Sequence, residues 1–322
     1  MMNKTPGVSV IIPTLNRPKL VIRCVESIYN QTFKGKINCI VVDSSDNDKT
    51  ELAIKNFDIK NKNFNLEYIN NKNSAFPIDN WAYAINKLNT EYAKFTCDDD
   101  WLESTFFSEC INIFEKNHVD CVVSNISLHK EFTKGKETID AYYKYKDGVA
   151  TKEQVTNSFL GIDDILPVTP TASLMKTEEL KESFYSSLKH IECTKFLFGF
   201  DFYMNYFSVF RGDGTYLLQK NLVNSWAGDD SMTLNTKNAK ISYCYFFALL
   251  RLIDHSNFKT SLEQKKFIQH RLATIKIKSI LKKEYKEIIL PTSIKPKLIL
   301  SKLVLDKIKK IYIKLLYRYI KN

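Results

Sequence analysis

Three consecutive aspartates, Asp98, Asp99 and Asp100, are the residues whose types and spacing most directly suggest chemistry. Two unit charges about 4 Å apart repel by roughly 4 kcal/mol at an effective dielectric near 20, so such a cluster needs a reason to exist. Adjacent carboxylates that follow a strand suit Mg²⁺ or Mn²⁺, which prefer oxygen ligands and are often shared with substrate phosphates. The alternative is that Asp100 or a neighbour caps a helix beginning near Glu103.

Two other polar clusters also follow short apolar runs in the first third of the chain. TLNR (14–17) comes after VSVIIP (8–13), and DSSDND (43–48) comes after INCIVVD, just as the aspartates come after EYAKFT. Each run is typical of a buried parallel strand. In parallel α/β sheets, ligands bind outside the carboxyl ends of the strands. We therefore expect the three loops to converge on one rim.

The elements that must hold these loops alternate between strand and helix. Apolar residues recur at helical spacing in segment 19–30, and further helices are expected before and after the aspartates. This alternation predicts an α/β fold, a mostly parallel sheet flanked by helices with right-handed crossovers. From about residue 240 onward the chain reads as helical. The other expected elements are helices at 46–57, 79–88 and 103–117 and strands at 65–69 and 119–124.

Four segments, taken together, give the chain a resemblance to a known enzyme family. VSVIIPTLNR, SIYNQTF, CIVVDSSDNDKT and DNWAYAINKLNTEYAKFTCDDDWL, in that order and spacing, look like the nucleotide-binding half of a family-2 glycosyltransferase of the GT-A (Rossmann-like) fold. The resemblance covers about residues 6 to 125. It implies transfer of a sugar, with inversion, from a nucleotide-diphosphate donor, assisted by a divalent cation such as Mn²⁺ or Mg²⁺.

The resemblance also implies which residues form the donor site. Asp98, Asp99 and Asp100 match the family's DxD-type element, which holds the metal and the donor ribose and diphosphate; the triplet allows two registers, so the direct metal ligand stays open. Asn80 and Trp81 match the segment that covers the donor. The donor-binding residues implied in this way are Pro13, Thr14, Leu15, Asn16, Arg17, Asp43, Ser44, Asn80, Asp98 and Asp99.

Two positions depart from the common family pattern, and both lie in the implied base pocket. Leu15 stands where many members have a tyrosine, and Ser44 stands where many have a second aspartate. A pyrimidine nucleotide, by default a UDP-sugar, remains the expected donor.

A second motif, GFDFYMNYF (199–207), resembles the family's acidic segment that carries the general base. Asp201 matches that base, which takes a proton from the acceptor hydroxyl as the hydroxyl attacks the anomeric carbon. The alternative is that Asp201 caps the following helix. The weaker candidates for the base are Asp163, Asp164, Asp229 and Asp230.

Cysteine content and charge narrow the class of protein. Seven cysteines without a C-x-x-C pair indicate neither a disulfide framework nor a zinc site, so we expect reduced thiols in a cytoplasmic protein. Of the net charge of +11, the eight lysines, one arginine and one aspartate of residues 295–321 account for +8. The rest of the chain is therefore nearly neutral, which argues against a nucleic-acid groove.

Residues 295–322 combine this charge with leucine, isoleucine and tyrosine residues at three-to-four spacing. Such a pattern suits a helix that lies in an anionic leaflet, peripheral on the inner face of the cell membrane. The alternative is a terminal helix packed on the body. The longest apolar run, at 243–250, is far below the roughly 18 residues that a membrane span needs.

The sequence thus predicts a metal-dependent, inverting glycosyltransferase of the hexosyltransferase type that extends a lipid-linked bacterial surface glycan, such as an O-antigen, capsule or outer-core saccharide. The alternatives are a transferase acting on a protein or soluble acceptor, and a non-catalytic basic protein that binds membrane or nucleic acid. We expect a donor-binding half at 1–125, an acceptor-binding half at 126–238 and a helical extension with the basic tail at 239–322.

Overall fold

The computed structural model describes residues 7–72, 74, 76–132, 135–139, 144–163, 165–190, 198–228 and 238–281. The chain divides into two compact units, Met1–Phe258 and Lys259–Asn322. The first unit contains the sheet and the elements up to α9 (Asn238–His255), and the described part of the second is α10 (Leu262–Leu281). No helix within these described ranges has the length and apolar character to cross a membrane.

The first third of the chain forms the parallel part of the sheet, in the order β3-β2-β1-β4. Thr14 at the end of β1 lies opposite Asp43 at the end of β2, so the loops after these strands begin side by side. The predicted mostly parallel α/β fold is confirmed. The elements are β1 (Gly7–Thr14), α1 (Pro18–Tyr29), β2 (Lys36–Asp43), α2 (Lys49–Lys55), β3 (Phe64–Asn70), α3 (Pro77–Ile85) and β4 (Tyr92–Phe95).

The next part of the chain extends the same sheet with a different pattern. The short strand β9 lies antiparallel between β4 and β6, and β10 runs parallel to β6 on the far side. The elements are β5 (Trp101–Leu102), α4 (Phe106–Lys116), β6 (Cys121–Phe132), β7 (Gly135–Ile139), β8 (Gly148–Val149), α5 (Lys152–Leu160), the 3-10 turn η1 (Pro170–Ala172), β9 (Ser173–Lys176), α6 (Thr177–His190), α7 (Phe200–Arg211) and β10 (Thr215–Gly228).

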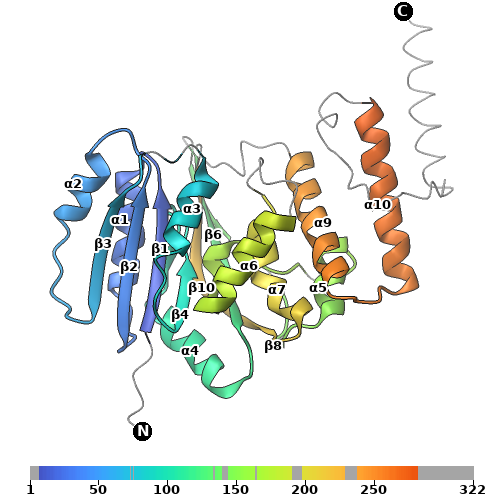
Figure 1. The fold of residues 1–322 in the computed structure, drawn as a ribbon, viewed down its shortest axis with the longest axis horizontal. Helices are drawn as coiled ribbons and strands as arrows, with labels where there is room; N and C mark the ends of the chain where they lie inside the picture. The colour runs from blue at the N-terminus through green and yellow to red at the C-terminus, as the bar shows by residue number, and fades with distance from the viewer. Residues whose placement is uncertain are drawn as a thin grey trace, which may run out of the picture. The chain divides into compact units, whose positions relative to one another are not determined.

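Helices cover the strands of the sheet, which explains the continuous apolar runs of β1 and β2. Helix α3 contacts β1 and β2, α6 contacts β4 and β9, and α7 contacts β6 and β10. Figure 1 shows α3 and α6 lying across the strands on the viewer's side. In β1, Val10, Ile11 and Ile12 are fully buried, as expected for a strand enclosed on both faces.

A buried lysine connects strand β4 to the η1 and β9 segment, which belongs to the other half of the sheet. Lys94 in β4 is fully buried, and its ammonium donates hydrogen bonds to the carbonyl oxygens of Thr171 and Ser173, the latter at 3.0 Å. The Phe106 ring lies 4.0 Å from the ammonium. Burial lowers the pKa of Lys94 to about 7. This side chain therefore fixes η1 and β9 against β4, directly below the three aspartates.

Replacing Lys94 with methionine should flatten the pH dependence of stability between about pH 7 and pH 9. In that window the unfolded chain keeps a proton on this lysine that the folded chain has released, so the free energy of unfolding of the wild type rises with pH. The variant lacks this contribution. Urea unfolding of both proteins at several pH values measures the difference, which should grow in favour of the wild type as pH rises. A difference that is constant with pH would contradict the lowered pKa.

Candidate active site

The loops after β1 and β4 meet at one edge of the sheet and are joined by side-chain contacts. The Thr14 hydroxyl donates to Asp98 Oδ2 at 2.7 Å. Arg17 Nη1 lies 3.2 Å from Asp98 Oδ1 and 3.1 Å from Asp99 Oδ2, so one guanidinium pairs with both carboxylates.

The loop after β2 joins them: the backbone N–H of Asn16 donates to the Ser45 hydroxyl at 2.7 Å. The convergence of the three loops, predicted from the sequence, is confirmed.

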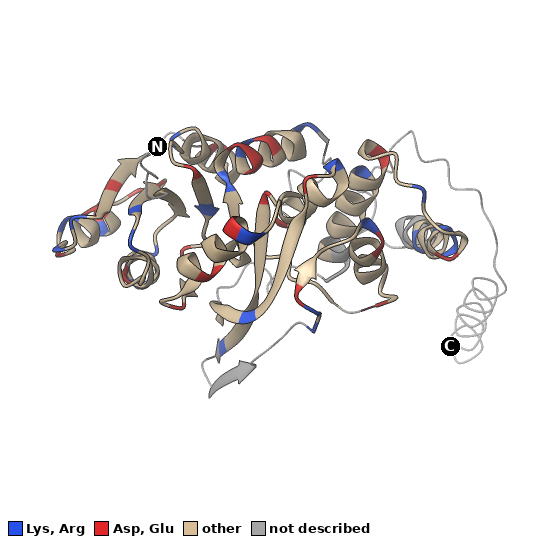
Figure 2. Ribbon diagram, turned by 90° about the horizontal axis from the view of Figure 1, so that it is seen from below, with Lys and Arg blue, Asp and Glu red and all other residues tan. Residues whose placement is uncertain are grey.

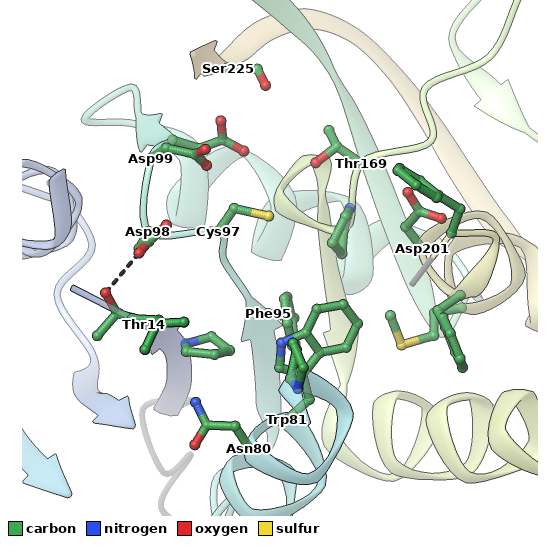
Figure 3. A pocket seen from close by; sticks show the side chains of 18 of the residues that line it. Thr14, Asn80, Trp81, Phe95, Cys97, Asp98, Asp99, Thr169, Asp201 and Ser225 are labelled. Carbon is green, nitrogen blue, oxygen red and sulfur yellow. Dashed lines mark hydrogen bonds between the residues drawn. The ribbon is translucent and has the colours of Figure 1, made fainter. Parts of the chain in front are cut away.

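These loops line a cavity of about 450 Å³, shown in Figure 3. Asp98 and Asp99 lie on one side and Asp201 on the other, with Trp81 and Phe95 between them. The aspartates and the proposed base thus face a common space. The lining includes these residues of the sequence-based site: Pro13, Thr14, Leu15, Arg17, Ser44, Asn80, Trp81, Asp98, Asp99, Asp100 and Asp201.

Asp43 and Asn16, which the sequence also assigned to the donor site, are not among the residues that line the cavity. Asp43 is buried; its Oδ1 accepts from the backbone N–H and the hydroxyl of Ser45, and its Oδ2 accepts from the Tyr68 hydroxyl at 2.9 Å. Asn16 has a φ of 56°, in the left-handed region. Both residues shape the loops from behind the cavity wall.

Asn80 supports the wall from α3. It is buried, its amide donates to the Val42 carbonyl at 3.0 Å, and its side-chain oxygen accepts from Asn71 at 2.9 Å. Neighbouring Trp81 packs edge-on against Phe95, with ring centroids 5.1 Å apart, and against Phe200 at 6.3 Å. Helix α3 thus gives the cavity an aromatic wall that reaches from β4 to α7.

Asp98 and Asp100 are buried and lie beside Asp99, which raises the pKa values of both. Burial, and then the charge of Asp99, raise the pKa of Asp98 to about 6, although Thr14 and Arg17 act in the opposite direction. Burial and Asp99 also raise the pKa of Asp100, whose Oδ1 accepts from the backbone N–H of Trp226 at 3.1 Å. Positive charge at this edge of the sheet would therefore stabilise the ionised carboxylates.

The structure excludes the helix-cap alternative for the triplet. Helix α4 begins at Phe106, its N-cap residue is Thr105, and no side-chain cap hydrogen bond forms there. Asp100 instead reaches across to β10 through Trp226.

The fit of a divalent cation rests on Cys97, Asp99 and Asp100. One ligand atom from each lies within 4.8 Å of the others, whereas both oxygens of Asp98 already accept hydrogen bonds from Thr14 and Arg17. Carboxylate oxygens suit Mg²⁺ or Mn²⁺, but a thiol is a soft donor. Burial raises the pKa of the Cys97 thiol. Asp99 and Asp100 therefore fit a hard cation, and the role of Asp98 as a direct ligand stays a prediction.

Asp201 lies in the first turn of α7 and points into the cavity from the other side. Its Oδ1 accepts from the backbone N–H of Phe202 at 2.9 Å, and its Oδ2 accepts from the Tyr245 hydroxyl at 2.5 Å. Burial raises the pKa of Asp201 to about 6, against the opposing effect of these hydrogen bonds. The N-cap of α7 is Gly199, so Asp201 is not the cap residue. At neutral pH this carboxylate is largely ionised and able to accept a proton.

The weaker candidates for the base do not compete with Asp201 within the described residues. Asp163 is exposed, accepts from Asn157 Nδ2 at 2.8 Å and is not among the residues lining the cavity. Asp164, Asp229 and Asp230 lie outside the described residues.

Sequence reasoning missed several residues that line the cavity. The sequence assigned no role in the site to Cys97, Met204, Trp226 or Tyr245. Thr169 and Pro170 also line the cavity and received no role from the sequence. Signals existed for Cys97, which adjoins the aspartates, and for Met204, one helical turn after Asp201. Tyr245 and Trp226 come from elements whose approach to the site no local pattern reveals.

Comparisons with known proteins agree with this geometry. The family model described as Glycosyl transferase family 2 matches residues 9–184. The chain is 24% identical over 252 residues to GalNAc(5)-diNAcBac-PP-undecaprenol beta-1,3-glucosyltransferase of Campylobacter jejuni, covering 78% of this chain and 75% of the relative. It is 24% identical over 271 residues to poly(ribitol-phosphate) beta-N-acetylglucosaminyltransferase TarP of Staphylococcus aureus, covering 83% of this chain and 76% of the relative.

Solved structures show the same fold. Residues 1–349 of S. aureus TarS in complex with UDP superpose with a TM-score of 0.59 at 15% identity, covering 86% of this chain and 75% of that one. The same S. aureus protein in complex with UDP-GlcNAc gives a TM-score of 0.53 at 16% identity, covering 88% and 84% of the two chains.

Replacing Asp99 and Asp100 together with asparagine should weaken Mn²⁺ binding by about a hundredfold or more, because each lost charge near a cation is worth a few kcal/mol. Asparagine keeps an acceptor for the Trp226 N–H. Electron paramagnetic resonance titration of MnCl₂ in the presence of UDP measures the affinity.

The control is Asp58→Asn, which removes one negative charge at an exposed residue outside the site. If Asp98→Asn abolishes binding while the double variant keeps it, Asp98 is the ligand and the assignment to Asp99 and Asp100 is wrong.

Proposed function

The chain belongs to glycosyl transferase family 2, and from this premise we propose that it transfers a sugar from a nucleoside-diphosphate donor to a hydroxyl of a lipid-linked bacterial glycan, with inversion at the anomeric carbon. The observation that carries the proposal is the cavity in which Asp98 and Asp99 face Asp201. An inverting transfer needs a diphosphate site and a carboxylate base on opposite sides of one sugar.

The donor is proposed to be a UDP-sugar bound at the rim formed by the loops after β1, β2 and β4. The complexes of S. aureus TarS with UDP and UDP-GlcNAc support this choice. Leu15 and Ser44 line the cavity at the positions expected for the base pocket, while Arg17 offers a guanidinium beside the diphosphate site. A divalent cation held by Asp99 and Asp100 supplies Lewis-acid neutralisation of the diphosphate when it is bound.

Asp201 is proposed to act as the general base. Its carboxylate takes the proton from the acceptor hydroxyl while that oxygen forms a bond to the anomeric carbon and the bond from that carbon to the UDP oxygen breaks. The electron pair of the broken bond leaves with UDP. Trp81, Phe95 and Phe200 form the adjacent aromatic wall, which helps to keep water from competing with the acceptor.

The proposed acceptor is a glycan on a lipid carrier. The C. jejuni relative is named for an undecaprenol-linked acceptor, and the S. aureus relative TarP for poly(ribitol-phosphate). These names support a bacterial surface or lipid-linked glycan over a protein acceptor.

Asp201→Asn should cut turnover by about 10²-fold or more, the usual scale for lost general-base catalysis, with nearly unchanged donor affinity. In the wild type, turnover should fall as pH drops through about 6, because Asp201 then becomes protonated. UDP release from a panel of UDP-sugars with MnCl₂, followed against pH, measures both effects. Wild-type turnover in the variant would show that another group is the base.

Action at an anionic membrane surface is proposed through residues 295–322, which lie outside the described residues. Their net charge and apolar spacing in the sequence support this. Figure 2 shows lysine and arginine interspersed with aspartate and glutamate along the described elements, so positive charge is not gathered there into one continuous stripe.

Deleting residues 295–322 should release the protein from anionic vesicles while donor hydrolysis persists. Binding of the full chain should weaken with salt, because the Debye length falls from about 10 Å at 0.1 M to about 3 Å at 1 M. Co-sedimentation with phosphatidylglycerol vesicles, and with phosphatidylcholine vesicles as the neutral control, measures binding. A truncated protein that unfolds would identify the tail as a packed helix of the body.

A further inference from the structure

We propose that Tyr245, on helix α9, is a positioning residue that orients the Asp201 carboxylate for proton transfer, and that Gly199 is the residue that lets α9 approach closely enough for this contact. The inference rests on the proposed function, in which Asp201 is the general base. It adds a residue from a part of the chain that lies beyond residues 9–184, the range matched by the family model.

The first observation is the contact itself. The Tyr245 hydroxyl donates to Asp201 Oδ2 at 2.5 Å, while the backbone N–H of Phe202 donates to Oδ1 at 2.9 Å. One donor on each oxygen fixes the rotation of the carboxylate. Both Asp201 and Tyr245 line the cavity, so the fixed carboxylate faces the space where the acceptor binds.

The second observation explains how α9 comes so close. Gly199, at the N-terminal end of α7, has a φ of 94°, which side chains with L chirality rarely adopt. A Cβ added there would lie 3.0 Å from the carbonyl oxygen of Cys244 and 3.5 Å from the Cβ of Ala248. Cys244 directly precedes Tyr245. A side chain at residue 199 would therefore crowd the backbone of α9 next to the tyrosine.

The third observation separates this contact from ordinary packing. The Tyr245 ring already packs edge-on against Phe202, with centroids 6.4 Å apart, so phenylalanine would keep the ring contact and lose only the hydroxyl. The hydrogen bond favours ionised Asp201, whereas burial opposes ionisation. The other titratable groups that line the cavity are Arg17, Cys97, Asp98, Asp99 and Asp100, on the loops after β1 and β4.

The decisive experiment compares Tyr245→Phe with the wild type in the pH dependence of UDP release from UDP-GlcNAc with MnCl₂. Loss of the hydrogen bond should move the acid limb of kcat upward by about one pH unit, since one unit is the scale of a single interaction with a charged group. Turnover at about pH 5, on the acid limb of both proteins, should therefore fall about tenfold, with KM for the donor nearly unchanged. A purely structural role would lower the plateau without moving the limb.

Tyr203→Phe is the matched control. Tyr203 lies on α7, is fully buried, and shares a hydrogen bond with the Ser186 hydroxyl at 2.9 Å, yet it is not among the residues lining the cavity. Removing its hydroxyl tests the cost of deleting a buried hydrogen bond near Asp201 without touching the site. Its acid limb should coincide with that of the wild type.

Asp201→Asn distinguishes the two possible failures. Wild-type turnover in Asp201→Asn would remove the base assigned under the proposed function, and this inference with it. An inactive Asp201→Asn together with a Tyr245→Phe profile that matches the wild type would overturn only the role of Tyr245.

If UDP-GlcNAc is not turned over, a double-mutant cycle of Tyr245→Phe and Asp201→Asn tests the same contact. The cycle measures the coupling between the two residues in the free energy of unfolding, by urea unfolding. The coupling should be measurable at about pH 8, where Asp201 is ionised, and smaller at about pH 5. Additive effects at both pH values would overturn the inference.

Discussion

The repulsion among three adjacent aspartates at the edge of the sheet, two of them buried, is the constraint on which the rest of the site depends. Asp98 and Asp100 are almost fully buried, so their charges must be met by donors brought in from elsewhere. The loop after β1 supplies Thr14 and Arg17, α1 supplies Arg23 to the Asp99 carbonyl, and β10 supplies the Trp226 N–H. Each of these donors ties a different element to the triplet. The carboxylates therefore organise the edge at the same time as they prepare it for a ligand.

The same need for partners joins the two halves of the sheet around the cavity. Strand β4 carries the triplet at its end and Lys94 in its middle, and Lys94 binds the carbonyl oxygens of the η1 and β9 segment from the other half. The backbone at Cys97 is also fixed, because its N–H donates a hydrogen bond to the Thr171 hydroxyl at 3.1 Å. Strand β4 and the residues just after it thus hold the two halves of the sheet together around the cavity. A displacement of η1 would therefore also displace the loop that carries the aspartates.

The sequence predicted the parallel part of the fold and the meeting of the loops after β1, β2 and β4 because both are encoded locally. Spacing alone predicts where the short β-branched strands lie. It also predicts the polar residues that follow or end them, such as Thr14, Asp43 and Asp98. The remainder depends on contacts far apart in the chain. Strand β9 has four residues and inserts antiparallel between β4 and β6, and Tyr245 meets Asp201 only because Gly199 admits α9. Contacts of this kind leave no periodic pattern in the sequence, so neither β9 nor the role of Tyr245 was predicted.

Charge balance at the rim explains why an additional cation suits this site. Arg17 and Arg23 contact the triplet, but they bring two positive charges to three carboxylates. A nucleoside diphosphate would add further negative charge to the same edge, where burial strengthens every electrostatic interaction. The two arginines cannot offset both the carboxylates and a diphosphate. A divalent ion held by Asp99 and Asp100 would offset this excess. The proposed base Asp201, on the opposite wall, is outside this group of carboxylates.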